Sequence, residues 1–321
     1  MGSDPIALPL LDWLAGEGGT LAEVVAVYTQ PDRPAGRGQK VAAGPIKRWA
    51  EAHGRPVRQP EKLTPDERAW IAALAADVTL VMAYGHLLGD EFIATPRLGT
   101  LNLHASLLPH YRGASPIQTA IAAGERETGV TLMRIVRRLD AGPVGGSERV
   151  AIGPLDGAPE VEAGLARAGV TLLARTLPLL RDGALPFVPQ DEARASYCRR
   201  LTKEDGRLDF QAPAAALAAR VNGLHPWPGC TAEIGGVTVR IGLADAPAPA
   251  GGAAAPGTVL GADAMGLLVA TGAGTLRLRR LQRPGGKLLP APEFLRGRAV
   301  PAGTRLASHP MTTLAGPAPF R

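Results

Sequence analysis

Three polar residues near the middle of the chain, Asn102, His104 and Asp140, have the side chains needed for chemistry on a carbonyl group. One residue separates Asn102 from His104, and Asp140 lies in a later segment. An amide and a protonated imidazole can stabilise an oxyanion, and an imidazole or a carboxylate can accept a proton. This set suits acyl transfer to an amine, because the carbonyl oxygen gains negative charge while the attacking nitrogen loses a proton.

The segment Leu98–His104 has to position the first two of these side chains. Its polar and apolar residues alternate, which predicts a strand with Asn102 and His104 on one face. Two residues along a strand rise roughly 6.6 Å, so the two side chains would flank a substrate group of a few atoms. A turn and an apolar helix, Ile117–Ala122, follow. Both side chains would then lie at the carboxyl end of a strand, where open α/β sheets bind ligands.

Asp140 follows a second predicted strand, Val130–Val136, in a segment with Gly and Pro that predicts a loop. Such a loop can return to His104, where a carboxylate would fix the imidazole tautomer and favour its protonated form. Each motif alone also fits a structural role, Asn-x-His within a strand and Asp-x-Gly in a turn. The combination favours catalysis.

These motifs resemble those of the folate-dependent formyltransferases, which move a formyl group from 10-formyltetrahydrofolate to an amine. The similarity begins with Asn102-x-His104-x-Ser106-Leu107-Leu108-Pro109 and Asp140-x-Gly142. Further segments resemble the methionyl-tRNA formyltransferases within that group, and the resemblance covers nearly the whole chain. These segments are Tyr28–Gly38, Gln59–Leu63, Ala83–Gly85, Lys203–Gly206, Pro226–Gly229 and Leu281–Lys287.

The resemblance implies formyl transfer to the α-amine of charged initiator tRNA, with 10-formyltetrahydrofolate as co-substrate and no metal. Asn102 and a protonated His104 would receive the oxyanion, and Asp140 would orient and charge His104. The folate-binding residues would be Tyr84, Gly85, Ser106, Leu107, Leu108, Pro109 and Gly142. The tRNA-binding residues would be Arg33, Arg37, Lys40, Lys203 and Lys287, with Arg37 sensing the acceptor end.

The chain is long enough for two domains, and its positive charge is concentrated in the second part. Residues 1–190 hold 19 Lys and Arg against 20 Asp and Glu, whereas residues 191–321 hold 16 against 9. A net charge of +7 on the second part therefore favours a polyanionic partner there. The alternative is a composition effect, because 30 of the 35 basic residues are Arg.

Cysteine usage and hydropathy indicate a protein of a reducing compartment. The two cysteines, Cys198 and Cys230, have no metal-binding spacing and cannot form a disulfide framework. Neither a signal peptide nor a run of about 20 apolar residues is present. We expect a cytoplasmic protein with no membrane partner, and a monomer.

Strands alternating with helices predict an α/β fold for residues 1–184, with a Rossmann-like open sheet rich in parallel strands. Residues 185–202 are expected to be a linker and residues 311–321 a tail. Between them, residues 203–310 contain about five short strands with Gly turns, which predicts a small β-barrel. The resemblance implies that this second domain is OB-like and binds tRNA.

Two departures from the family pattern stand out. Met1–Pro9 resembles the turn and helix that follow the first strand of the family, so the strand itself is missing. In a doubly wound sheet that strand is central, and its loss would expose two strand edges. We therefore expect an upstream start or a poorly stable chain. Pro143 stands where the family commonly has an acidic residue.

Three competing functions share parts of the pattern. Another formyltransferase would act on the amine of a nucleotide or an amino sugar, and a hydrolase would use water in place of the amine. A tRNA-binding protein without catalysis would result if the missing strand disrupted the folate site. A nicotinamide oxidoreductase is disfavoured, because no Gly-x-Gly-x-x-Gly motif opens a helix near the start.

Overall fold

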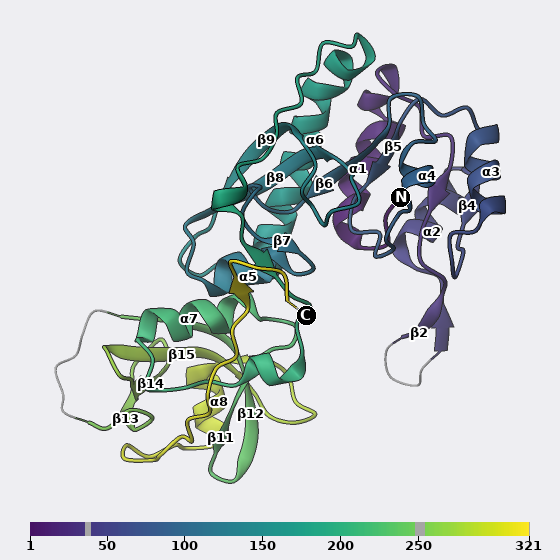
Figure 1. Ribbon diagram of the computed structural model, residues 1–321. Coiled ribbons are helices and arrows are strands. Elements are labelled where there is room, and N and C mark those ends of the chain that lie inside the picture. The colour runs from purple at the N-terminus through teal and green to yellow at the C-terminus, as the bar shows by residue number, and fades with distance from the viewer. Residues whose placement is uncertain (36–39, 248–253, 321) are drawn as a thin grey trace. The chain divides into compact units, whose positions relative to one another are not determined.

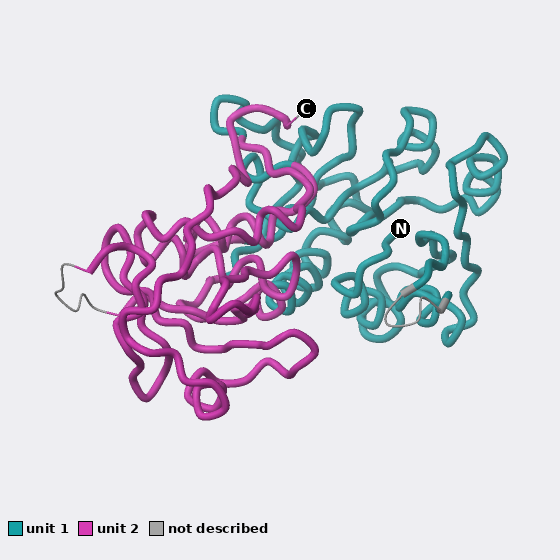
Figure 2. The backbone as a smooth tube through the Cα atoms, turned by 90° about the horizontal axis from the view of Figure 1, so that it is seen from below, with its two compact units in different colours: residues 1–112, 129–150, 162–195 teal, residues 113–128, 151–161, 196–321 magenta. Residues whose placement is uncertain are grey.

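The computed structural model describes residues 1–35, 40–247 and 254–320. Their contacts divide the chain into two compact units whose segments alternate along the sequence (Figure 2). Unit 1 contains Met1–Arg112, Gly129–Val150 and Glu162–Ala195. Unit 2 contains Gly113–Thr128, Ala151–Val161 and Ser196–Arg321. The two units are described separately below.

Unit 1 is built on two groups of strands with parallel pairing. β1 (Val27–Tyr28) pairs with β4 (Val57–Arg58), and β5 (Thr79–Val81) pairs with β6 (Thr100–His104). The larger sheet has the order β5-β6-β8-β9, with β8 at Glu127–Arg134 and β9 at Val144–Ala151. The parallel pairs confirm the predicted α/β sheet. The strand predicted at residues 130–136, however, runs antiparallel to β6 as part of β8.

Helices of unit 1 begin where the sequence provides start signals. α2 (Pro45–Ala52) and α3 (Pro65–Ala73) carry Pro in the first turn, and the Thr64 side chain accepts a hydrogen bond from the amide of Glu67. The long helix α6 (Ala158–Arg181) lies against β9 (Figure 1). A Cβ placed on Gly146 of β9 would lie 3.2 Å from Cδ1 of Leu172 on this helix. The shorter helical elements are η1 (Pro5–Ala7), α1 (Leu8–Ala15), η2 (Glu17–Thr20), α4 (Asp90–Ile93) and η3 (Glu192–Arg194).

Unit 2 contains a curled antiparallel sheet of six strands. The five strands predicted after Trp227 are all present, in the order β11-β12-β15-β14-β13, and β16 pairs with β15. Their bounds are Cys230–Ile234 for β11, Val237–Asp245 for β12, Val259–Ala262 for β13, Leu267–Ala270 for β14, Thr275–Gln282 for β15 and Leu289–Pro290 for β16. The β12–β15 register shifts near Leu243, which bends the sheet around its core.

Helices α5 (Pro116–Ala122), α7 (Ala214–Gly223) and α8 (Ala291–Gly297) complete unit 2. The α5 and α7 backbones approach so closely that a Cβ on Gly223 would lie 2.6 Å from the Ala122 nitrogen. Asn222 joins α7 to β12, because its side chain accepts from the amide of Ala244 and donates to the same residue's carbonyl, both at 2.9 Å.

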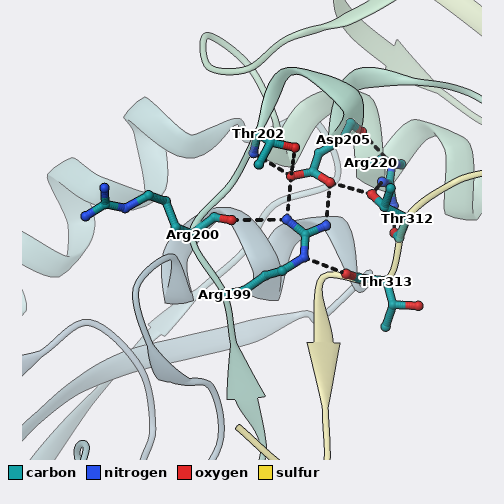
Figure 3. Close-up of polar contacts among 7 residues, drawn as sticks. All are labelled: Arg199, Arg200, Thr202, Asp205, Arg220, Thr312 and Thr313. Carbon is teal, nitrogen blue, oxygen red and sulfur yellow. Dashed lines mark hydrogen bonds and ion pairs between the residues drawn. The ribbon is translucent and has the colours of Figure 1, made fainter. Parts of the chain in front are cut away.

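The last residues of the chain are held to unit 2 by a buried carboxylate. Asp205, in η4 (Lys203–Gly206), accepts hydrogen bonds from Arg199 and from the Thr202 amide, at 2.8 and 2.7 Å, and from the Thr312 hydroxyl (Figure 3). Arg220 donates to the carbonyls of Asp205 and Thr312. β17 (Ala315–Gly316) then pairs with β10 (Tyr197–Cys198).

Three short strands remain. β2 (Arg33–Ala35) pairs antiparallel with β3 (Lys40–Ala42), and β7 covers Arg112–Gly113.

Candidate active site

Strand β6 positions the first two candidate residues. It lies between β5 and β8, and its apolar residues Leu101 and Leu103 are buried. Asn102 and His104 alternate with them and therefore point to the other face, as the sequence predicts. His104 is buried, with 6% of its surface exposed, and Asn102 is half-buried. A buried imidazole and a more accessible amide thus lie side by side on one face.

The imidazole of His104 lies between a carbonyl and a carboxylate. Its Nε2 is 2.9 Å from the carbonyl oxygen of Tyr111, and because a carbonyl only accepts, Nε2 carries a hydrogen. Its Nδ1 is 3.7 Å from Oδ2 of Asp140, which is beyond a hydrogen bond and within ion-pair range. The structure therefore brings His104 and Asp140 together.

Both partners of this imidazole have an uncommon backbone conformation. Tyr111 has φ 57° and Asp140 has φ 47°, in the left-handed region. For residues other than glycine this region is sparsely populated, although Asp adopts it more readily than most. Such strain persists only where the surrounding structure imposes it, and it is common at functional sites.

A glutamine that the sequence did not indicate holds the Asp140 loop in place. The Nε2 of Gln190 donates to the carbonyls of Asp140 and Gly142, both at 2.8 Å. Its Oε1 accepts from Nε and Nη2 of Arg112, at 3.1 and 2.8 Å. The fully buried Arg112 also forms a two-point ion pair with Glu192. Gln190 thereby connects a buried cation to the loop that carries Asp140.

The ion pair between Arg112 and Glu192 lowers the pKa of the Glu192 carboxyl group. Hydrogen bonds from Arg112, with a further contribution from Arg138, lower the pKa of Glu192 to about 2, although partial burial opposes this shift. The carboxylate is thus ionised at neutral pH and balances the buried Arg112.

The residues predicted to bind folate after β6 are anchored to β8. The buried Ser106 hydroxyl donates to the His110 carbonyl at 2.6 Å. Thr131 on β8 donates to the Ser106 carbonyl at 2.7 Å and accepts from the Leu108 amide at 3.2 Å. Leu107 and Pro109 are half-buried, and the Leu108–Pro109 peptide bond is cis. Three hydrogen bonds therefore set the shape of this loop.

Gly142 is the position of closest backbone approach in the Asp140 loop. It is buried, and a Cβ placed there would lie 1.8 Å from the Arg134 carbonyl oxygen. Only glycine fits at this distance, so Gly142 sets the path of the loop.

Tyr84 and Gly85 form the remaining part of the predicted folate site. The Tyr84 side chain is buried in an apolar cluster with Tyr28 and Val81, and burial, together with the charge of Glu67, raises the pKa of Tyr84 to about 12. Its carbonyl accepts from the side chain of Gln30 at 3.2 Å. Gly85, with φ 86°, then turns the backbone in a conformation that favours glycine.

Comparison with known proteins identifies the group to which the chain belongs. The formyl transferase family matches residues 6–177, and the formyl transferase C-terminal domain family matches residues 200–299. The chain is 47% identical to the methionyl-tRNA formyltransferase of Thiobacillus denitrificans, over 96% of this chain and 98% of that one. Identity to the corresponding enzyme of Methylococcus capsulatus is 44%, with the same coverage.

The chain belongs to the methionyl-tRNA formyltransferase family.

Solved structures with a similar fold include other formyltransferases. WlaRD, a sugar 3N-formyl transferase, matches with a TM-score of 0.63 and 16% identity, over 86% of this chain and 94% of that one. HypX from Aquifex aeolicus in complex with tetrahydrofolic acid matches with a TM-score of 0.55 and 19% identity, over 76% of this chain and 43% of that one. The chain therefore shares its fold with these two proteins. Its sequence identity to them, 16–19%, is much lower than its identity of 44–47% to the two methionyl-tRNA formyltransferases.

The predicted tRNA-binding residues of this formyltransferase are spread over both units. Arg33 is exposed in β2, and the backbone of Lys40 pairs with Ala35 across the hairpin. Arg37 lies outside the described residues. Lys203 in η4 and Lys287 after β15 are exposed in unit 2.

Among the residues that the structure describes, no group of three or more His, Cys, Asp or Glu could hold a metal ion. None of the helices there is both long enough and apolar enough to cross a membrane.

Proposed function

We propose that the chain transfers a formyl group from 10-formyltetrahydrofolate to the α-amine of methionyl initiator tRNA. The single observation that carries this proposal is the placement of His104 between the Tyr111 carbonyl and Asp140, on the same strand face as Asn102. Identity of 47% to the enzyme of T. denitrificans supports the choice of substrate.

In the proposed reaction the methionyl amine attacks the formyl carbon of the folate. A C–N bond forms, and the carbonyl oxygen becomes an oxyanion, which accepts a hydrogen bond from the amide of Asn102. His104 contributes through Nδ1, because its Nε2 is already held by the Tyr111 carbonyl. When the intermediate collapses, the bond from carbon to the folate nitrogen breaks, and the proton lost by the amine ends on tetrahydrofolate. Asp140 stabilises the imidazolium charge throughout.

The folate would bind against backbone groups. The segments at Gly85, at residues 106–109 and at residues 139–142 offer amide groups and aliphatic walls, which suit a flat ring with an amide-like edge. The hydrogen bonds that fix the last two segments support this assignment, because a pre-formed site needs no ordering when the ligand binds.

The tRNA would be held by both units. The curled antiparallel sheet of unit 2, the exposed Lys203 and Lys287, and the net charge of +7 on residues 191–321 support an OB-like tRNA-binding domain. Arg33 and Arg37 of the first unit would contact the acceptor end. The matches at residues 6–177 and 200–299 support the proposed domain limits of 1–184 and 203–310. The monomeric state and the cytoplasmic location stay predictions.

A transferase acting on an amino sugar is the main alternative, since WlaRD shares the fold. The difference between 47% identity to a tRNA-directed enzyme and 16% identity to a sugar-directed one favours tRNA. Hydrolysis of the folate would use the same oxyanion groups with water as nucleophile.

The test compares methionyl initiator tRNA, methionyl elongator tRNA and a dTDP-linked amino sugar as acceptors with 10-formyltetrahydrofolate. We expect formylation of the initiator alone, with a loss of about 10²–10³-fold in kcat for Asn102→Ala, because one oxyanion donor is removed. The variant Asp66→Asn, which changes an exposed carboxylate on α3, should retain full activity. Formylation of the sugar alone, or formate release without an acceptor, would refute the proposal.

A further inference from the structure

The side chain of Gln30 contacts two segments of unit 1 that the proposed function assigns to different substrates. Its Nε2 donates to the Tyr84 carbonyl at 3.2 Å, in the segment proposed to bind folate. Its Oε1 accepts from Nη2 of Arg33 at 3.5 Å, in the strand proposed to contact tRNA. All three residues belong to unit 1. A single carboxamide therefore connects the two proposed binding segments.

The peptide unit between Tyr84 and Gly85 is held by hydrogen bonds on its carbonyl side. The Ser3 hydroxyl donates to the Tyr84 carbonyl at 3.0 Å, so this oxygen has two donors, Ser3 and Gln30. The same hydroxyl accepts from the backbone amide of Gln30 at 3.0 Å. The peptide bond is trans, and the N–H of the exposed Gly85 therefore points opposite to the Tyr84 carbonyl. Gln30 thus helps to set the direction of a hydrogen-bond donor that a ligand can reach.

The base of the β2–β3 hairpin is fixed by Asp32, the residue directly before β2. Gln59 donates to the Asp32 carboxylate and to the Gln30 carbonyl, both at 2.8 Å. Lys47 on α2, the helix that follows β3, donates to the same carboxylate at 2.5 Å. The hydrogen bond from Lys47, followed by that from Gln59, lowers the pKa of the Asp32 carboxyl group. The start of the hairpin is therefore tied to the helix after it, on the same backbone segment as Gln30.

Arg33 combines an exposed position with a contact that limits its freedom. The 3.5 Å contact with Gln30 is longer than an ordinary hydrogen bond. A guanidinium has five N–H donors, so this contact leaves others for a phosphate. Ordering a long side chain costs conformational entropy when it binds a partner. A contact that already restricts the Arg33 side chain lowers that cost.

We infer that Gln30 is a positioning residue that couples the binding of folate to the binding of tRNA. A folate that accepts a hydrogen bond from the Gly85 N–H fixes the peptide unit before it, and with it the carboxamide that faces Arg33. Arg33 is then ordered before the tRNA binds, so each substrate reduces the ordering cost of the other. The inference rests on the proposed function for the identity of the two ligands.

The test measures the Kd of methionyl initiator tRNA with and without saturating tetrahydrofolate, and the Kd of tetrahydrofolate with and without the tRNA. Tetrahydrofolate carries no formyl group, so no transfer occurs during the titration. We expect each ligand to lower the Kd of the other about fivefold or more, and by the same factor, because linkage makes the two effects equal. This common factor is the coupling factor.

Two variants of Gln30 examine its role. Gln30→Met loses both contacts at nearly the same side-chain length, and should bring the coupling factor to within about twofold of one. It should also raise the Kd of tetrahydrofolate alone roughly fivefold, the effect of one hydrogen bond. Gln30→Glu keeps an acceptor for Arg33 and loses the donor to Tyr84, so it should lose the coupling as well. Gln211→Met, at an exposed position of unit 2, is the matched control and should keep the full factor, with Tm measured for every variant.

The inference and the proposed function fail in different ways. A coupling factor of one in the unaltered chain would overturn the inference, even if that chain formylates initiator tRNA. The same conclusion would follow if a Gln30 variant bound both ligands more weakly but kept the factor, because a merely structural role predicts that result. Absence of initiator tRNA formylation by the unaltered chain would instead refute the proposed function, and the coupling to tRNA with it.

Discussion

Gln190 holds the Asp140 loop by its hydrogen bonds to the carbonyls of Asp140 and Gly142. This contact leads to a specific prediction for the variant Gln190→Glu. The substitution is almost isosteric, and its new carboxylate keeps the two hydrogen bonds that Arg112 donates. It replaces the amide nitrogen, however, with an oxygen beside the carbonyls of Asp140 and Gly142. Two attractive contacts at 2.8 Å become repulsive, while the contact with the buried cation becomes stronger.

The expected magnitude follows from these contacts. Each carbonyl that loses its donor costs about 1 kcal/mol, so the loss of both hydrogen bonds favours displacement of the Asp140 loop by about 2 kcal/mol. The fold should survive, because Arg112 gains a charge-assisted partner. A displacement of about 1 Å at a catalytic group typically costs about 10²-fold in rate. We therefore expect kcat to fall roughly 10²-fold, with KM for the tRNA nearly unchanged, because Gln190 does not belong to the proposed tRNA-binding residues.

The assay is steady-state formylation of methionyl initiator tRNA, with Tm measured in parallel. Gln211→Glu, at an exposed position of unit 2, is the matched control and should have wild-type kinetics. A Gln190→Glu variant with kcat within twofold of wild type and an intact fold would refute the role of Gln190 as a positioning residue. A rise in KM alone would assign it to tRNA binding instead.

Three further outcomes are expected. Gly142→Ala should abolish measurable transfer or folding, because its Cβ would lie 1.8 Å from the Arg134 carbonyl, and activity and circular dichroism check this. Asp205→Asn should lower the free energy of unfolding in urea by about 3–5 kcal/mol, since it removes the charge of a fully buried carboxylate and leaves half-buried Arg199 without its anionic partner. Stability of the chain with a free Met1 amine should fall as pH drops from about 8 to about 5, by up to about 4 kcal/mol. The amine is protonated in the unfolded chain and neutral when buried, so acetylating it should remove this pH dependence.

Elements with local signals could be predicted from the sequence. Each of these signals lies within a few residues of the element that it predicts. Examples are the first-turn prolines of α2 and α3, the alternating residues of β6 and the glycines that bound the strands of unit 2. β9 cannot be predicted in this way, because Gly145 and Gly146 weaken its strand pattern. The structure explains both glycines, since Phe187 and Leu172 lie where a Cβ on each would reach.

In the candidate site, too, only residues with a local sequence signal could be predicted. Asn102 and His104 follow from strand alternation, and Asp140 follows from the loop signal only when it is combined with them. Gln190 gives no local signal, because its partners lie 48 to 78 residues away and the segment around it reads as a polar connector. The antiparallel direction of β8 is also a property of the assembled sheet rather than of its own sequence.

The distance between Nδ1 of His104 and Oδ2 of Asp140 could not be predicted from the sequence, and it affects which contacts Nδ1 can make. At 3.7 Å the Asp140 carboxylate lies within ion-pair range of Nδ1 of His104 and beyond hydrogen-bond distance. A shorter contact would engage Nδ1 in a hydrogen bond to Asp140 and turn it away from a reacting group. The left-handed backbone of Asp140 and the two hydrogen bonds from Gln190 hold the carboxylate at this distance. Because Nε2 is held by the Tyr111 carbonyl, Nδ1 is the ring nitrogen that remains for a reacting group in the proposed mechanism, and the hydrogen bonds from Gln190 would help to keep it available.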